Sequence, residues 1–258
     1  MSKCAYISYS ALKCFYGCGY RYFLKYVERQ KAKENCRNFV KGGVCHSCLS
    51  RWIKEGSCEP DVIFKFLDEE WQKYILNNFI QWRNDADKEK LYEEAKEHLV
   101  RIQDGFFGLD LHLHSISSEV SYKKWDVPNK FYMAGIVDIV DHTDSSVLDL
   151  KVTTAKKYYD TEQGLWYCIL LNKGGAGVKF GKFGQFVPLR KEVILWQDFE
   201  LSDLKEYWRK VLSGLNQIRE GKFERTTEKN NCWNCPYSFQ CRGDIEVKPS
   251  SKEGRASF

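Results

Sequence analysis

Residues 135–153, "GIVDIVDHTDSSVLDLKVT", contain two short apolar runs that each lead to an acidic side chain. The first run reaches Asp138 and the second reaches Asp149, with Lys151 two positions later. β-Branched residues with alternating polarity favour strands, and the polar residues between the runs favour a turn. Because side chains alternate along a strand, Asp149 and Lys151 share one face and the apolar residue between them enters the core.

Two carboxylates at the ends of adjacent strands can converge on one point. Hard cations such as Mg²⁺ and Mn²⁺ take oxygen ligands and keep water molecules for a phosphate substrate. A lysine beside them can orient or help deprotonate the attacking water and offset charge on phosphorus. A simpler interpretation makes Asp138 a polar residue before a turn, with Asp149 and Lys151 on the solvated face of an edge strand. The short pattern alone does not separate the two.

Further elements are expected on both sides of this pair. The periodicity predicts strands at 115–125, 130–142, 145–153 and 178–189, and helices at about 43–54, 61–77, 87–107, 158–172 and 201–220. Residues 8–28 predict a short helix capped by a serine, a turn carrying Cys18, and a second helix. The expected class is α/β, with a helical part at about 1–110 and a catalytic core at about 111–222.

Length and composition fit one domain over residues 1–242. The chain has 258 residues, of which 43% are hydrophobic, enough to form a core without disulfides. From Gly243 onward the sequence is polar, which predicts a disordered tail over 243–258. The longest apolar runs are too short to span a bilayer, so no membrane partner is expected. The N-terminus lacks the features of an export signal, so we expect a cytoplasmic, reducing environment.

The charge balance gives little information about partners. The net charge is +5, and the 40 lysines and arginines are interleaved with 35 acidic residues instead of forming a block. A small excess of positive charge that is spread along the chain is weak evidence for an anionic partner.

Three cysteines lie close together in residues 230–241, "NNCWNCPYSFQC", namely Cys232, Cys235 and Cys241. Thiolates at this spacing can face one ion, and soft sulfur selects zinc, copper(I) or an iron-sulfur cluster. Three sulfur ligands leave the site open. The chain has 11 cysteines, an odd number, and in a reducing compartment they are expected as core thiols and metal ligands.

Two other patterns carry polar side chains with helical spacing. Gln163 and Tyr167 are four residues apart and therefore lie on one helix face. His46 follows a glycine pair in "GGVCHSCLSRW" at the expected start of a helix. Alone, His46 also fits a capping or core histidine.

Taken in order, these patterns resemble the RecB-like branch of the PD-(D/E)xK nucleases, which includes CRISPR-associated adaptation exonucleases. The matching motifs are "ISYSALKCFYGCGYRYFLKYV", "GGVCHSCL", "GIVD", "LDLKVT", "QGLWY" and "CWNCPYSFQC". The resemblance runs from residue 7 to residue 241. It implies a restriction-endonuclease-like core, in which helices flank a central mixed sheet, with a helical N-terminal elaboration and an iron-sulfur staple that joins the N- and C-terminal regions.

The resemblance also implies residue roles. The metal ligands would be His46, Asp138, Asp149 and the main-chain carbonyl of Leu150. The catalytic set would be Asp138, Asp149, Lys151, Gln163 and Tyr167. The DNA contacts would come from Lys151, Gln163, Tyr167, Lys156 and Lys157. Further cations that fit a nucleic-acid channel are Lys123, Lys124, Lys179, Lys182, Arg190 and Lys191.

In iron-sulfur members of this branch, the opening motif supplies the fourth cysteine, which here is Cys18. The family usually has proline after this cysteine, whereas this chain has Gly19. The implied group is a structural [4Fe-4S] cluster, and zinc is an alternative occupant of the same four thiols. A separate zinc site at Cys45, His46 and Cys48, with Cys36, is a second alternative.

The implied function is Mg²⁺- or Mn²⁺-dependent DNA exonuclease activity on single-stranded or splayed ends. The implied partners are DNA and other DNA-processing or CRISPR adaptation proteins. Two alternatives from other classes are a catalytically weak DNA-binding adaptor with this fold and a zinc-stapled interaction module.

Overall fold

The computed structural model of the protein describes residues 5–30, 36–56, 62–108, 116–126, 128–153, 160–172, 180–187, 194–226, 232 and 235–246. The chain divides into two compact units. The first unit contains Met1–Ile7 and Asn35–Trp208, and the second contains Ser8–Glu34 and Arg209–Phe258. The single domain expected over 1–242 includes residues of both units and stays a prediction.

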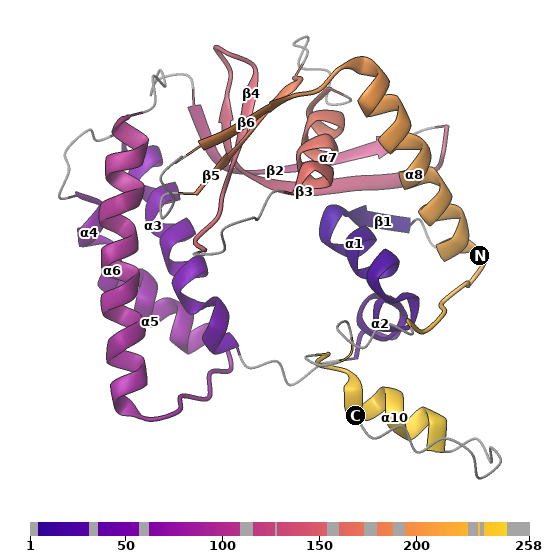
Figure 1. Ribbon diagram of the computed structural model, residues 1–258, viewed down its shortest axis with the longest axis horizontal. Helices are drawn as coiled ribbons and strands as arrows, with labels where there is room; N and C mark the ends of the chain where they lie inside the picture. Colours follow the sequence, from indigo (N-terminus) through magenta and orange to yellow (C-terminus); the bar gives the residue numbers. More distant parts are fainter. Residues whose placement is uncertain are drawn as a thin grey trace. The chain divides into compact units, whose positions relative to one another are not determined.

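In the described residues the strands form one six-stranded sheet with the order β1-β3-β4-β5-β6, and β2 pairs with β3 (Figure 1). The strands are β1 (Ala5–Ser8), β2 (Ile116–Asp126), β3 (Phe131–Asp141), β4 (Ser146–Leu150), β5 (Lys182–Phe186) and β6 (Ile194–Asp198). β4 and β5 are parallel, whereas β2–β3, β3–β4 and β5–β6 are antiparallel. The predicted mixed sheet of an α/β protein is therefore confirmed.

Aspartate side chains close the two turns on either side of β3. Oδ1 of Asp126 accepts a 2.9 Å hydrogen bond from the backbone N–H of Asn129 between β2 and β3. Oδ1 of Asp141 accepts a 2.8 Å hydrogen bond from the backbone N–H of Thr143 between β3 and β4. Such aspartate bonds to following amides stabilise tight turns. The turn at Asp141 joins β3 to β4, the two strands that carry Asp138 and Asp149.

Helix α7 (Thr161–Asn172) lies between the parallel strands β4 and β5 in the chain. Leu165–Leu171 are all buried, so this part of the helix packs within the interior on every side. A Cβ atom on Gly164 would lie 2.5 Å from the ring of Phe183 in β5. Glycine at this position therefore lets α7 approach the sheet closely, beside Gln163.

The helices α3 (Val40–Glu55), α4 (Val62–Lys65), α5 (Leu67–Asn77) and α6 (Asp85–Phe107) pack together, after the short 3-10 helix at Cys36–Phe39 (Figure 1). Their apolar side chains share one core cluster with Ile139, Leu148, Leu150 and Phe186 of the sheet. Each fully buried leucine contributes about 2 kcal/mol. Burial of Leu148 and Leu150 therefore anchors β4, and with it the intervening Asp149.

Several element boundaries differ from the predictions. α3 begins at Val40, so Gly42 and Gly43 lie inside the helix instead of before it. A Cβ atom on Gly43 would clash with the ring of Tyr74 from α5, which explains why glycine is accommodated there. The helix expected at 61–77 is two helices, α4 and α5. The short strands β1 and β6 were not predicted.

The second unit contains α1 (Tyr9–Gly17), α2 (Gly19–Tyr22), the π-helix at Phe23–Val27, the later part of α8 (Leu201–Arg219) and α10 (Ser238–Glu246). Oγ of Ser8 accepts a 3.2 Å hydrogen bond from the backbone N–H of Ala11, which caps α1 as predicted. Cys18 separates α1 from α2, and its Sγ accepts from the backbone N–H of Arg21 at 3.4 Å.

The first residues of the tail predicted from Gly243 onward are helical instead of disordered. α10 extends to Glu246, so residues 243–246 are helical. A polar segment has few apolar side chains to bury, but its backbone can still form helical hydrogen bonds. The remaining part of the predicted tail, 247–258, lies outside the described residues.

Candidate functional site

Asp138 and Asp149 lie on the adjacent antiparallel strands β3 and β4. The register pairs Ile139 with Leu148, immediately beside the two acidic residues. The backbone N–H of Leu150 donates a 2.9 Å hydrogen bond to Oδ2 of Asp138. This bond ties the Asp138 carboxylate to the neighbouring strand. The two carboxylates therefore converge as the sequence predicts.

Lys151, Gln163 and Tyr167 are joined to Asp149 in one polar network. Nζ of Lys151 lies 2.7 Å from Oδ2 of Asp149 and donates a 3.1 Å hydrogen bond to Oε1 of Gln163. Nε2 of Gln163 lies 2.8 Å from Oδ1 of Asp149 and also 2.8 Å from the hydroxyl oxygen of Tyr167. The amide of Gln163 thus contacts both the acid and the lysine and holds their relative positions.

His46 comes to the same site from α3. Its Nδ1 lies 3.4 Å from Oδ1 of Asp138, and its side chain is partly exposed. His46 is therefore the solvent-accessible edge of the cluster, whereas Asp149 is only 1% exposed. The structure brings together all six side chains that the sequence singles out, from α3, the β3–β4 pair and α7.

The two carboxyl groups have different electrostatic environments. Burial would raise the pKa of Asp138, but the facing His46, Lys151 and the N–H of Leu150 together hold this pKa below its usual value. Burial raises the pKa of Asp149 to about 6, against the opposing charge of Lys151. Burial lowers the pKa of His46, but Asp138 outweighs it and raises this pKa overall. Two acids whose pKa values are driven apart are typical of catalytic pairs.

The carboxylate oxygens are donors that suit a hard cation, although the side chains are not arranged as a complete metal site. Oδ2 of Asp149 is buried, and its ion pair with Nζ of Lys151 at 2.7 Å occupies only one of its lone pairs. Such an acceptor has a lone pair available for a metal ion. Within the described residues, no group of three or more His, Cys, Asp and Glu side chains is spaced to hold a metal. His46 and Lys151 neutralise the carboxylates, so an ion would replace part of these contacts.

Two residues near the site were not predicted. Asp160 precedes α7, and its Oδ1 accepts a 3.3 Å hydrogen bond from the backbone N–H of Gln163. The sequence signal was available, because an aspartate three residues before glutamine is typical of a helix start. Gln185 pairs with Asp149 across β4 and β5 and is fully buried. The position of Gln185 depends on the register between β4 and β5, which the local sequence pattern does not specify.

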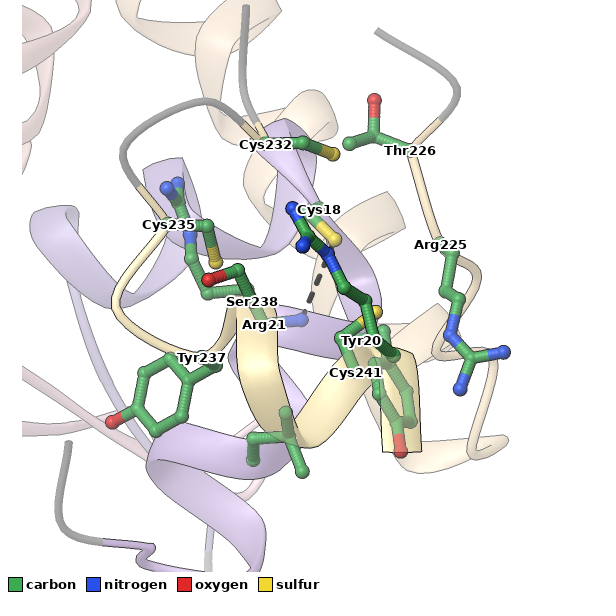
Figure 2. Close-up of a pocket in the computed structure, with 12 residues that line it drawn as sticks. Cys18, Tyr20, Arg21, Arg225, Thr226, Cys232, Cys235, Tyr237, Ser238 and Cys241 are labelled. Carbon is green, nitrogen blue, oxygen red and sulfur yellow. Dashed lines mark hydrogen bonds between the residues drawn. The ribbon is translucent and has the colours of Figure 1, made fainter. Parts of the chain in front are cut away.

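The four predicted cluster cysteines line one pocket of about 130 Å³ in the second unit (Figure 2). Figure 2 shows the side chains of Cys18, Cys232, Cys235 and Cys241 arranged around this pocket. All four are free thiols that are partly exposed. Thiols are the soft donors that a thiolate-bound metal group takes, but among the described residues no three of them are spaced to hold an ion as they stand.

Arginine side chains surround the same cysteines. Arg21 and Arg225 line the pocket together with the thiols. Burial lowers the pKa of Arg21, but the thiols of Cys14, Cys235 and Cys18 raise it overall, so its charge is retained. Burial raises the pKa of Cys241, while Arg225 acts in the opposite direction. Positive charge beside a thiol favours the thiolate form, which is the form that binds metals. At Cys241 burial outweighs this effect, so the pKa stays above its usual value.

The alternative zinc site at Cys45, His46 and Cys48 does not form. Cys45 and Cys48 are fully buried in the helical core cluster, and Sγ of Cys45 donates to the backbone carbonyl of Ala95 at 3.8 Å. His46 instead contacts Asp138. Burial raises the pKa of the Cys48 thiol to about 12, which disfavours a thiolate ligand. The side chain of Cys36 lies outside the described residues.

Some predicted cations also fall outside the described residues. Lys156, Lys157, Lys179, Arg190 and Lys191 belong to this group. Lys123, Lys124 and Lys182 are described and lie on β2 and β5.

The chain belongs to the PD-(D/E)XK nuclease superfamily, whose sequence model matches residues 6–242. The resemblance carried by the sequence motifs is therefore confirmed at the superfamily level. The fold is also similar to a solved structure from Eubacterium rectale described as a "Putative exonuclease", with a TM-score of 0.52 and 14% identity. That match covers 87% of this chain and 85% of the other. The chain matches none of the curated proteins.

None of the described helices is both long and apolar enough to cross a bilayer.

Proposed function

We propose that the protein is a metal-dependent DNA exonuclease that hydrolyses phosphodiester bonds at single-stranded or splayed DNA ends. The observation that supports this proposal most strongly is the polar network on β3, β4 and α7. It combines two carboxylates of different pKa with a lysine 2.7 Å from one of them, in a chain of this nuclease superfamily.

Asp138, Asp149, His46 and the main-chain carbonyl of Leu150 would hold Mg²⁺ or Mn²⁺, the ions that this superfamily typically uses. The chemistry supplied by such an ion is activation of water and neutralisation of charge on the phosphate. Lys151 would orient the attacking water and offset charge on phosphorus. Gln163, supported by Tyr167 and the cap at Asp160, would position Lys151 and Asp149 relative to each other.

Cys18, Cys232, Cys235 and Cys241 would hold a [4Fe-4S] cluster with a structural role in the second unit. The support is the shared pocket and the order of the motifs in the sequence. The cluster would link residues near both ends of the chain, which closes a long loop and lowers the entropy of the unfolded state. Roles in recombination or CRISPR adaptation, and partner proteins in these pathways, follow from the resemblance alone.

A nuclease assay tests this proposal directly. End-labelled single-stranded and double-stranded DNA would be incubated with the protein, with and without Mn²⁺, together with a circular single strand of the same length. An exonuclease degrades the linear DNA in the presence of Mn²⁺ and leaves the circle intact. Binding without degradation would favour the adaptor function instead.

A further inference from the structure

An exposed group of aromatic side chains and one lysine lies on β1, β2 and β3 and takes no part in the site described above. We call it the aromatic strip, and its members are Tyr6, Lys123, Trp125 and Tyr132. Tyr6 is 57% exposed and Trp125 is 41% exposed. Soluble proteins seldom leave adjacent large aromatic side chains in water without a function.

Strand register places these side chains on one face. β2 and β3 pair Trp125 with Tyr132, and Lys123 with Ala134. Directly opposed residues of antiparallel strands project to the same side of a sheet. The ring centroids of Trp125 and Tyr132 are accordingly 4.7 Å apart. The small side chain of Ala134 leaves room for Lys123 beside the neighbouring rings.

Lys123 lies between two tyrosines. Its Nζ is 4.5 Å from the ring centroid of Tyr132 and 5.8 Å from that of Tyr6. Such cation–π contacts hold the ammonium group at the level of the rings. The strip therefore presents flat apolar surfaces and a positive charge side by side. An apolar protein surface would have to desolvate that charge, whereas a nucleic acid offers bases for the rings and phosphate for the ammonium.

The position of the strip points to a single-stranded substrate. Tyr132 lies six residues before Asp138 on β3. At about 3.3 Å per residue, the two positions are about 20 Å apart, a distance of a few nucleotides. Bases of a duplex are stacked on one another and cannot stack on side chains, whereas unpaired bases can.

From this geometry we propose that the aromatic strip binds unpaired bases of the DNA strand whose scissile phosphate lies at Asp138 and Asp149. This inference rests on the proposed nuclease function and adds a binding subsite to it. Trp125 and Tyr132 stack on bases, and Lys123 contacts the adjacent phosphate. Trp125, Tyr132 and Lys123 thus set the preference for single-stranded ends.

The chain offers a matched control at another part of the same sheet. Trp196 on β6 is also 41% exposed, and Nζ of Lys182 lies 4.4 Å from its ring centroid. The pair has the same chemistry as the strip, but it lies on β5 and β6 and, among the described residues, has no stacked ring partner such as Tyr132 provides for Trp125. Trp196→Ala therefore removes an equally exposed tryptophan without changing the strip.

Binding is measured by fluorescence anisotropy of labelled oligothymidine in EDTA, where hydrolysis is prevented. Trp125→Ala is expected to weaken binding about tenfold, and Trp196→Ala less than about twofold. Lys123→Gln is expected to reduce the slope of log K against log salt by about 0.7. A duplex of the same sequence should bind with little dependence on Trp125. Circular dichroism and thermal melting check that each variant is folded.

The outcomes separate the strip from the nuclease function. If wild type degrades DNA with Mn²⁺ but Trp125→Ala binds single strands as tightly as wild type, the strip proposal is overturned and the nuclease proposal stands. If Trp125→Ala weakens binding while wild type degrades no DNA, the strip proposal stands and the proposed nuclease function is overturned. If wild type binds no single strand, the strip proposal is overturned, and a protein partner becomes the occupant to seek.

Discussion

Gln163 donates a 2.8 Å hydrogen bond from Nε2 to Oδ1 of Asp149, which joins α7 to β4. The same amide accepts from Lys151 through Oε1. One side chain therefore sets the relative positions of the acid and the lysine. This arrangement makes the function of the site depend on a residue that need not touch the substrate.

Gln163→Leu is expected to lower kcat by about tenfold to a hundredfold, because Lys151 loses its acceptor and Asp149 loses a donor. Leaving the buried Oδ1 of Asp149 without this donor would then lower the free energy of unfolding by about 1–3 kcal/mol. Tyr167→Phe serves as the milder companion, since it removes only the hydroxyl that contacts Gln163. Kinetics with labelled DNA and urea unfolding measure the two effects. Equal activity of Gln163→Leu and wild type would exclude the positioning role.

The elements that carry this network could be predicted because their signals are local. Alternation along β4 places Asp149 and Lys151 together, and helical spacing places Gln163 beside Tyr167. The buried position of Gln185 could not be predicted in this way, because it depends on the parallel pairing of β4 with β5. Pairing across an intervening helix is a tertiary property.

Other differences have similar causes. The strand β1 contains only four residues, so its alternation is too short to be distinguished from a loop. The strand β6 was missed although its five residues match the length of β4 and β5. Glycines 42 and 43 normally indicate a helix boundary, yet they are accommodated inside α3 because Tyr74 packs against Gly43. Cys45 and Cys48 have the spacing of a metal site, but helix packing places them in the core.

The raised pKa of Asp149 predicts a pH-dependent stability in metal-free protein. Its folded-state pKa of about 6 exceeds the unfolded value of about 4, so the native state binds more protons between these values. Ionisation of Asp149 therefore destabilises the fold as pH rises through this window. Asp149→Asn removes this cost, and its stabilising effect should be larger at pH 7 than at pH 4. Urea unfolding in EDTA at both pH values measures it.

Asp87 supplies a control in which the contribution to stability changes with pH in the opposite direction. Hydrogen bonding to Arg37 lowers the pKa of Asp87 to about 2, below its unfolded value. Its contribution to stability is therefore present above pH 4 and is lost as pH falls toward 2. Asp87→Asn should destabilise the protein at pH 7 and less so at pH 3. The same trend with pH in both variants would contradict the account of Asp149.

The cysteine pocket predicts a coloured protein. Anaerobically purified wild type should be brown and absorb at about 400 nm, as expected for a cysteine-bound [4Fe-4S] cluster. Cys18→Ser and Cys235→Ser should each lose this absorbance, because both thiols line the same pocket. Cys168→Ala is the control, since Cys168 is buried in α7 and burial raises its pKa to about 12.

Metal analysis accompanies the absorbance measurement. A colourless wild-type protein with one zinc per chain would replace the iron-sulfur cluster by zinc at the same thiols. Colour retained in Cys18→Ser but lost in Cys235→Ser would remove Cys18 from the ligand set.

Degradation of end-labelled DNA by wild type, Asp149→Ala and Lys151→Ala in Mn²⁺ tests the central claim most directly. Asp104→Asn, at an exposed position on α6, is the control for handling and folding. We expect wild type and Asp104→Asn to degrade DNA at equal rates, and both site variants to lose about a hundredfold or more while remaining folded. Undiminished cleavage by both Asp149→Ala and Lys151→Ala would contradict the assignment of this site.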